Sequence, residues 1–298
     1  MKRVFSWVGL SSLALVSFMA TDYPVPISTN TKTQQERSEA CTISNSAFKS
    51  GEEMTYKLYY NWGVVWVAAG EVTFRVKDLG TQYQVSAHGS TYKSYEWFYK
   101  VNDKYDTWLD KQTMLPVVSI RDVQEGKYRL YDKITFDHAQ GKAVSLRGKT
   151  KEQATATEYA IDACMHDILS IVYYVRNVNF DQMRTGTDIP MKIFVDKKAW
   201  ALKLRYLGKD DNKKIKGQGR FRAITFTPQV VEGFYFKQGT EMKIWATDDK
   251  NKIPLMIESP LTVGSVKAVL KNYKGLRHNM SAKVGDYNKN DDDPDLPD

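Results

Sequence analysis

The chain has 298 residues, of which 42% are hydrophobic and 26% charged, a balance typical of a globular protein rather than a disordered one. This length accommodates two ordinary domains or one large β domain. The net charge of +8 favours either anionic glycans and lipid headgroups as partners or simply solvated lysines along sheet edges. Nucleic acid is not expected as a partner outside the cytoplasm, and the sequence has no nucleic-acid recognition motif.

Residues 1–20 predict a secretory signal. Lys2 and Arg3 precede an apolar run of about 15 residues that ends at the small residue Ala20. The run is shorter than the roughly 20 residues that span a bilayer, although an uncleaved anchor remains the alternative. Residues 21–45 are polar and predict a linker. We therefore expect an exported protein, periplasmic or extracellular, with no transmembrane span after signal cleavage.

The only two cysteines, Cys41 and Cys164, can form a disulfide in an oxidising compartment, and two buried free thiols are the alternative. Two cysteines and four scattered histidines give no metal-ligand spacing. The sequence therefore predicts neither a metal nor another cofactor.

Strand patterns dominate from residue 46 to about residue 150. Alternating apolar residues, such as the series Val72, Phe74 and Val76, predict an antiparallel meander. A helix near residues 162–177 follows, because Ile168, Ile171, Val172 and Val175 share helical spacing, and Asp162 is placed to cap it.

Strands return between about residues 180 and 275. Residues 209–216, KDDNKKIK, predict a charged hairpin loop between two of these strands. Residues 281–298 are rich in Asp and predict a disordered acidic tail.

Two segments, WLDKQTMLP from Trp108 to Pro116 and WATDDKNKIP from Trp245 to Pro254, resemble each other. Each begins on a Trp at a strand end, turns through polar residues, and resumes at a Pro. Asp248 and Asp249 fit a structural role, since Asp side chains accept hydrogen bonds from turn amides.

This resemblance suggests that the two halves arose by duplication, as does the similarity of GEEMTYKLYY and GTDIPMKIFV, the first strand segments of the two halves. The alternative is that the two halves merely use the same common types of hairpin turn. The predicted fold is mainly β, with two duplicated, curved antiparallel sheets, barrel-like or sandwich-like, at about 46–150 and 180–275. One connecting helix joins them within a single domain, residues 46–280.

Four segments in order are similar to a family of exported bacterial proteins catalogued as domain of unknown function 3108: FKSGEEMTYKLYYNWGVVWVAAGEVTF, DILSIVYYVRN, GRFRAITFTP and MKIWATDDKNKIPLMIESPLTVGSVKAVL. The similarity extends from about Phe48 to Tyr273. It implies a mostly β envelope protein forming one integrated domain. It implies no activity and no catalytic residue.

No catalytic residue is predicted from the chain's own motifs. There is no G-x-S-x-G motif, and Cys164 and His166 are two positions apart, which points their side chains to different helix faces. The first alternative function is a polysaccharide-acting enzyme that uses a cleft between the halves, with Tyr, His or Asp as acid and base. Asp110 and Asp249 are the obvious pair of carboxylates from the two similar segments.

Aromatic residues in the first half are the main candidates for a binding site: Tyr60, Trp62, Trp66, Tyr92, Tyr95 and Trp97. They either fill an ordinary core or form a surface for sugar rings or acyl chains. The favoured hypothesis is an exported, non-catalytic protein that binds a lipid or glycan in an apolar cavity lined by Trp and Tyr. The second alternative is a structural scaffold that pairs its sheet edge with an envelope protein partner.

Overall fold

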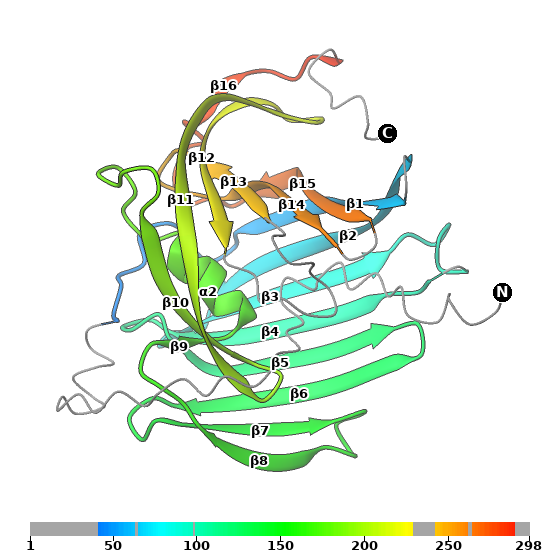
Figure 1. Ribbon diagram of the computed structural model, residues 1–298, viewed down its shortest axis with the longest axis vertical. Helices are drawn as coiled ribbons and strands as arrows, with labels where there is room; N and C mark the ends of the chain where they lie inside the picture. Colours follow the sequence, from blue (N-terminus) through cyan, green and yellow to red (C-terminus); the bar gives the residue numbers. More distant parts are fainter. Residues whose placement is uncertain (1–40, 63–64, 98, 229–241, 262–263, 290–298) are drawn as a thin grey trace.

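The computed structural model describes residues 41–62, 65–97, 99–228, 242–261 and 264–289. The predicted signal at 1–20 and most of the predicted linker lie outside these residues. The described chain is mostly strand, with one helix (Figure 1).

The first half forms a run of eight strands: β1 (Glu53–Trp62), β2 (Val65–Asp78), β3 (Gln82–Thr91), β4 (Asn102–Asp110), β5 (Pro116–Glu125), β6 (Tyr128–Asp137), β7 (Lys142–Gly148) and β8 (Thr155–Ala160). The second half contains the following elements: β9 (Met165–His166), α2 (Ile168–Val175), β10 (Asp188–Val195), β11 (Lys198–Ile215), β12 (Gly219–Pro228), β13 (Lys243–Thr247), β14 (Pro254–Pro260), β15 (Ser265–Lys274) and β16 (Lys283–Gly285).

The strands form one sheet in the order β8-β7-β6-β5-β4-β3-β2-β1-β15-β14-β13-β12-β11-β10-β9, and β16 pairs with β12 off this path. All pairs are antiparallel except β9 with β10. The prediction of a mainly antiparallel β fold with one helix is confirmed. The two halves are joined edge to edge through β1 and β15 into one curved sheet, which ends at β8 and β9 without closing.

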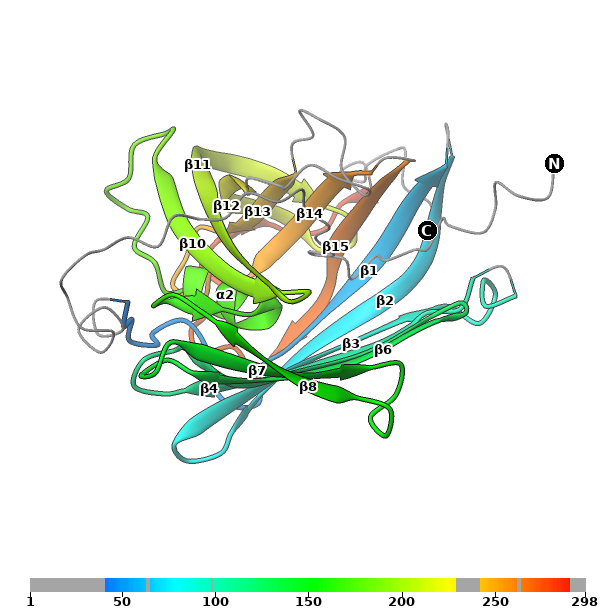
Figure 2. The ribbon, with the colours of Figure 1, turned by 60° about the horizontal axis from the view of Figure 1, so that its bottom comes forward.

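The sheet curves around α2, which lies between the β9–β10 end and the strands β3 and β4 (Figure 2). The curvature brings the first and last parts of the sheet to opposite sides of the helix. The main core therefore contains buried side chains from both halves, such as Phe74 and Leu109 from the first and Ile193 and Phe226 from the second.

Helix α2 begins at Ile168 because Asp167 and Ser170 form a capping box. Asp167 Oδ1 accepts from the amides of Leu169 and Ser170 at 2.8 and 3.2 Å, and Ser170 Oγ accepts from the Asp167 amide at 2.8 Å. The predicted cap at Asp162 was wrong: Asp162 forms an ion pair with Lys192 at 2.8 Å. The short strand β9 occupies the residues between, so the helix starts later than its apolar spacing suggested.

Cys41 and Cys164 form a disulfide, with their Cα atoms 5.4 Å apart, as predicted. It ties the segment before β1 to the segment before α2. The segment between Cys41 and β1 is also bonded to the chain just after α2, because Asn177 Oδ1 accepts from the amides of Ser46 and Ala47 at 2.7 and 3.0 Å. The last residues of the predicted linker are thus part of the folded structure.

Two expectations about polar segments were wrong. The predicted loop at 209–216 lies mostly inside β11, which continues to Ile215 through two register shifts opposite β12. Ile215 and Phe221 are buried at the end of this long hairpin, so apolar burial extends the strand despite its charged exposed positions. The first residues of the predicted tail are instead part of the fold, because Ala282 is buried and β16 pairs with β12.

Candidate functional site

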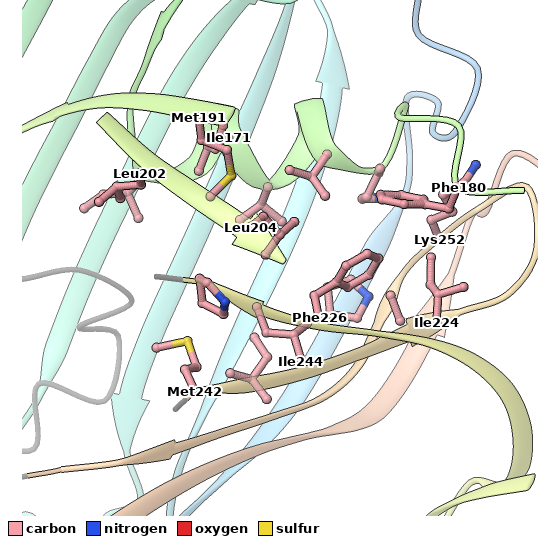
Figure 3. Close-up of a pocket in the computed structure, with 18 of the residues that line it drawn as sticks. Ile171, Phe180, Met191, Leu202, Leu204, Ile224, Phe226, Met242, Ile244 and Lys252 are labelled. Atoms are coloured by element: carbon pink, nitrogen blue, oxygen red, sulfur yellow. The ribbon is translucent and has the colours of Figure 1, made fainter. Parts of the chain in front are cut away.

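An apolar cavity of about 150 Å³ lies between α2 and the strands β10 to β14 (Figure 3). The side chains that line it come from the helix, from alternate positions of the strands and from the segments between them: Ile168, Ile171, Val172, Val175, Arg176, Phe180, Met191, Ile193, Leu202, Leu204, Ile224, Phe226, Pro228, Met242, Ile244, Ala246, Lys252, Pro254 and Ile257.

The sequence builds this cavity from two periodicities. The helix presents Ile168, Ile171, Val172 and Val175 on one face, at the 3.6-residue period. Strands β10 to β13 each contribute residues two positions apart, as Leu202 and Leu204 do in β11, because alternate strand residues share a face. An apolar helix face and an apolar sheet face therefore meet without filling the space between them.

Two cations interrupt the apolar lining, and the first of them is already paired. The Arg176 guanidinium donates to both carboxylate oxygens of Glu52, at 2.6 and 2.8 Å, and to the Asn251 carbonyl at 3.0 Å. Burial disfavours its charge, but the Glu52 carboxylate more than offsets this and raises the pKa of Arg176. Arg176 therefore contributes its hydrocarbon stem to the cavity and has its charge neutralised by Glu52.

The second cation, Lys252, is partly buried, and within the described residues its ammonium has no hydrogen bond or ion pair. Burial lowers the pKa of Lys252, and the Asp181 and Asp249 carboxylates oppose that shift. Lys252 lies beside Phe180 at one end of the cavity, with Met242 and Leu202 towards the other (Figure 3). The cavity is thus apolar along its length, and Lys252 belongs to one end of it.

Lys252 is held by the second of two matching turns. In the first, Trp108 pairs with Val118 and Leu109 with Pro116; in the second, Trp245 pairs with Met256 and Ala246 with Pro254. Both copies shift register at the same step. In both, the amide two residues after the Trp donates across the turn to the residue before the Pro: Asp110 to Leu115 at 3.0 Å, and Thr247 to Ile253 at 2.9 Å.

In each of the two turns, one Asp side chain accepts hydrogen bonds from two backbone amides. Asp110 Oδ1 accepts from the amides of Gln112 and Thr113 at 3.0 and 2.9 Å. Asp249 Oδ1 accepts from the amides of Asn251 and Lys252 at 2.9 and 3.2 Å. The second predicted turn residue, Asp248, instead forms an ion pair with Lys209 at 2.8 Å. The structural role expected for Trp108, Pro116, Trp245, Asp248, Asp249 and Pro254 stays a prediction.

Five of the six predicted ligand-binding aromatics have side chains in the described part of the structure, and none of these five lines this cavity. Tyr60 is buried in a separate small cluster, and Trp66 is partly buried with the Lys267 ammonium 4.7 Å from its ring centre. Trp62 lies in β1, but its side chain is outside the described part of the structure.

The other three aromatics belong to the segment around the β3–β4 connection. The Tyr92 hydroxyl donates to Glu71 at 2.5 Å, the Tyr95 amide donates to the Tyr92 carbonyl at 2.9 Å, and Trp97 is 83% exposed. The ligand role of all six remains a prediction. The cavity itself is lined by aliphatic side chains and two phenylalanines instead of the Trp and Tyr that were expected.

The described residues bring no nucleophile and base together at the cavity. Cys164 is in the disulfide, and the hydroxyl of Ser170 serves the helix cap. His166 Nδ1 lies 3.2 Å from that hydroxyl, but both side chains are buried and neither lines the cavity. Asp110 and Asp249 are both used in their turns, and neither lines the cavity. Within the described ranges, no three His, Cys, Asp or Glu residues are placed to hold a metal ion.

Comparisons with known proteins support the fold. The family described as "Protein of unknown function (DUF3108)" matches residues 55–271. A solved structure described as a β-barrel-like protein of domain of unknown function DUF1849 from Brucella abortus is similar, with a TM-score of 0.52 and 11% identity over 76% of this chain and 99% of that chain. Comparison with curated proteins gives no match. In the described residues, no helix is long and apolar enough to cross a membrane.

The apolar face of the helix was predicted from the sequence, but its place in the wall of a cavity was not. The helical spacing of Ile168, Ile171, Val172 and Val175 was read correctly, whereas the facing strand residues look like any alternating strand. The missed signal was Lys252, a lysine immediately before Ile253 and Pro254, at a position where the matching turn has Met114.

Proposed function

The chain belongs to the family described as "Protein of unknown function (DUF3108)", and we propose that it is an exported, non-catalytic protein that binds the apolar chain of a lipid between α2 and strands β10 to β14. The observation that carries the proposal is the cavity. Every side chain that lines it is apolar except Arg176 and Lys252, and Arg176 is neutralised by Glu52.

The lining favours an acyl chain over a glycan. Sugar hydroxyls need hydrogen-bond partners when they are buried, and the cavity walls offer almost none. An apolar space of about 150 Å³ lined by aliphatic side chains suits an apolar group better than a polar one. A chain of methylene groups meets this requirement, and its burial is favourable by about 0.8 kcal/mol for each methylene.

Export is supported by two observations. The Cys41–Cys164 disulfide is a bond that persists in oxidising compartments. The first 20 residues have the cationic and apolar segments of a secretory signal. A periplasmic or extracellular location gives the protein access to envelope lipids, which agrees with lipid binding.

A partner-binding scaffold is the second candidate, because β8 ends the sheet with most of its side chains exposed. β8 pairs with β7 without a register shift and contains a single charged residue, Glu158, so little in its own sequence blocks a further strand. A photo-crosslinker at Thr157, used in the native envelope, tests this candidate. A discrete protein adduct supports a scaffold, and its absence rejects one.

Native mass spectrometry of the protein purified from its own source tests lipid binding. We expect a population that is heavier by the mass of a lipid and that loses it in organic solvent. The Ile244→Trp variant, which places a large ring in the cavity, should carry less lipid than the wild type. The Val144→Trp variant, on exposed β7, is the matched control and should carry the same amount. A clean mass for the wild type, with no affinity for lipids or glycans in a binding panel, contradicts the proposal.

A further inference from the structure

We propose that Lys252 binds the negatively charged headgroup of the ligand, and that the ligand is therefore an anionic amphiphile whose head is a carboxylate or a phosphate. This inference rests on the proposed function, because it names the class of lipid that the same cavity takes. It follows from the position of Lys252, from a comparison of the two matching turns, and from the way the second turn is held.

Lys252 is placed to meet the head of a ligand that fills the cavity. Lys252 lines the cavity at the end where Phe180 lies, and the remaining length is apolar (Figure 3). A chain that fills the apolar part places its head at one of the two ends. Only one end has a cation whose charge no described residue neutralises, since the Arg176 guanidinium is bound by Glu52. An anionic head at Lys252 forms a charge-assisted hydrogen bond in partly buried surroundings, where such bonds are strong.

The matching turn in the first half has no lysine at the position of Lys252. Lys252 and Met114 occupy the same place, two residues before the Pro, and both have a positive φ, 46° for Lys252 and 58° for Met114. In the first half this position holds a fully buried methionine within the main core. In the second half it holds a lysine at the end of a cavity, although burial lowers the pKa of that amine. The second turn thus has a lysine beside an apolar space, at the position where the first turn has a buried methionine.

The turn also fixes the backbone that carries Lys252. The Asn251 side chain donates to the carbonyls of His278 and Asn279 at 3.1 and 3.3 Å, and the Asn251 carbonyl accepts from Arg176. The amide of Lys252 donates to Asp249. These hydrogen bonds position the backbone of Lys252 before a headgroup binds, which lowers the entropic cost of binding.

The neighbouring carboxylates leave the Lys252 ammonium available. Asp249 uses Oδ1 for the turn amides and Oδ2 for the amide of Ala282 at 3.3 Å, and Asp248 is paired with Lys209. Asp181 is exposed, and its negative charge favours the charged form of Lys252, but the two side chains form no ion pair in the structure. Water screens an exposed carboxylate, so a bound anion at the cavity end competes with it effectively.

The test compares three ligands that share a twelve-carbon chain: dodecanoate, dodecyl phosphate and the neutral dodecanol. Affinities are measured by isothermal titration calorimetry for the wild type, Lys252→Met and Lys250→Met. The methionine variant copies the residue that the first turn carries at the same φ, so the fold tolerates it. Lys250 lies two residues away in the same turn, is exposed and does not line the cavity, which makes it the matched control.

We expect the wild type to bind at least one of the two anions about tenfold more tightly than dodecanol, the gain typical of one charge-assisted hydrogen bond. Lys252→Met should remove this preference and leave the affinity for dodecanol within about twofold, while Lys250→Met should behave as the wild type does. The tighter of the two anions identifies the head as carboxylate or phosphate.

Two results would overturn the inference, and they differ in what else they reject. Equal binding of dodecanol and both anions, unchanged in Lys252→Met, overturns the headgroup role but leaves lipid binding intact. Absence of binding of all three ligands to the wild type overturns lipid binding as well.

Discussion

Arg176 at the end of α2 and Glu52 just before β1 form a bidentate ion pair that is almost completely buried, with side-chain exposures of 2% and 0%. The Arg176 guanidinium also lies over the rings of Tyr173 and Phe48, at 5.1 and 5.5 Å from their centres. This pair fastens the only helix of the described chain to the strand where the two halves of the sheet meet. It therefore sets the position of the helix wall of the cavity.

Glu52→Gln should destabilise the protein by roughly 3–5 kcal/mol, because it leaves the Arg176 charge buried without a counter-charge. The adjacent Glu53→Gln is the matched control. Glu53 forms ion pairs with the exposed Arg75 and Lys274, and exposed pairs contribute only about 0–1 kcal/mol. Urea denaturation measures both variants, and equal losses would show that the Glu52–Arg176 pair does not hold the helix.

Loss of the Cys41–Cys164 disulfide should lower the free energy of unfolding by about 4 kcal/mol, since the bond closes a long loop. The double variant Cys41→Ser with Cys164→Ser and the reduced wild type should have matching denaturation midpoints, both below that of the oxidised protein. An unchanged midpoint after complete reduction, verified by thiol titration, would contradict this prediction.

Asp249→Ala and Asp110→Ala should each cost roughly 1–3 kcal/mol, because each removes an acceptor for several turn hydrogen bonds. The two variants should differ in ligand binding. Asp249→Ala releases the amide of Lys252 and should weaken dodecanoate binding, whereas Asp110→Ala should leave it unchanged. Denaturation and calorimetry on the same samples separate these effects, and equal loss of binding in both variants would argue against the cavity as the site.

Acid should destabilise the protein in part through His166. Burial lowers the pKa of His166 to about 3 in the folded chain, from 6.5 in the unfolded chain. Between these values the unfolded state binds the additional proton, so stability falls as the pH falls through this window. The wild type should lose about 2–3 kcal/mol more than His166→Phe between pH 6.5 and pH 4.5, at 1.36 kcal/mol for each pKa unit. Parallel pH profiles of the two proteins would contradict the neutral, buried state of His166.

The sequence predicted the fold class because alternation, turn residues and helix spacing are local signals. Val72, Phe74 and Val76 show period two, and Gly126 and Gly141 mark two of the turns. Pairing between distant strands is not local, so the joining of β1 to β15 and the resulting single sheet could not be read from either segment. The start of α2 was misplaced because Asp162 and Asp167 both precede the same apolar pattern.

The candidate site was harder to predict than the fold. Aromatic residues drew attention to Trp62, Trp66 and Trp97, whereas the cavity is lined by Ile, Leu, Val and Met that look like ordinary core residues in the sequence. A cavity is a space between two surfaces, and no single segment of sequence encodes it. The useful local signal was the difference between Met114 and Lys252 in two otherwise similar turns.

The most direct measurement of the central claim is a methyl NMR titration of the protein labelled at its methionine methyl groups. Met191 and Met242 line the cavity, whereas Met54 and Met165 are buried elsewhere. Binding of an acyl chain in the cavity predicts that dodecanoate shifts the signals of Met191 and Met242 and leaves those of Met54 and Met165 in place. Shifts confined to Met54 and Met165, or no shift at any methionine at saturating dodecanoate, would contradict it.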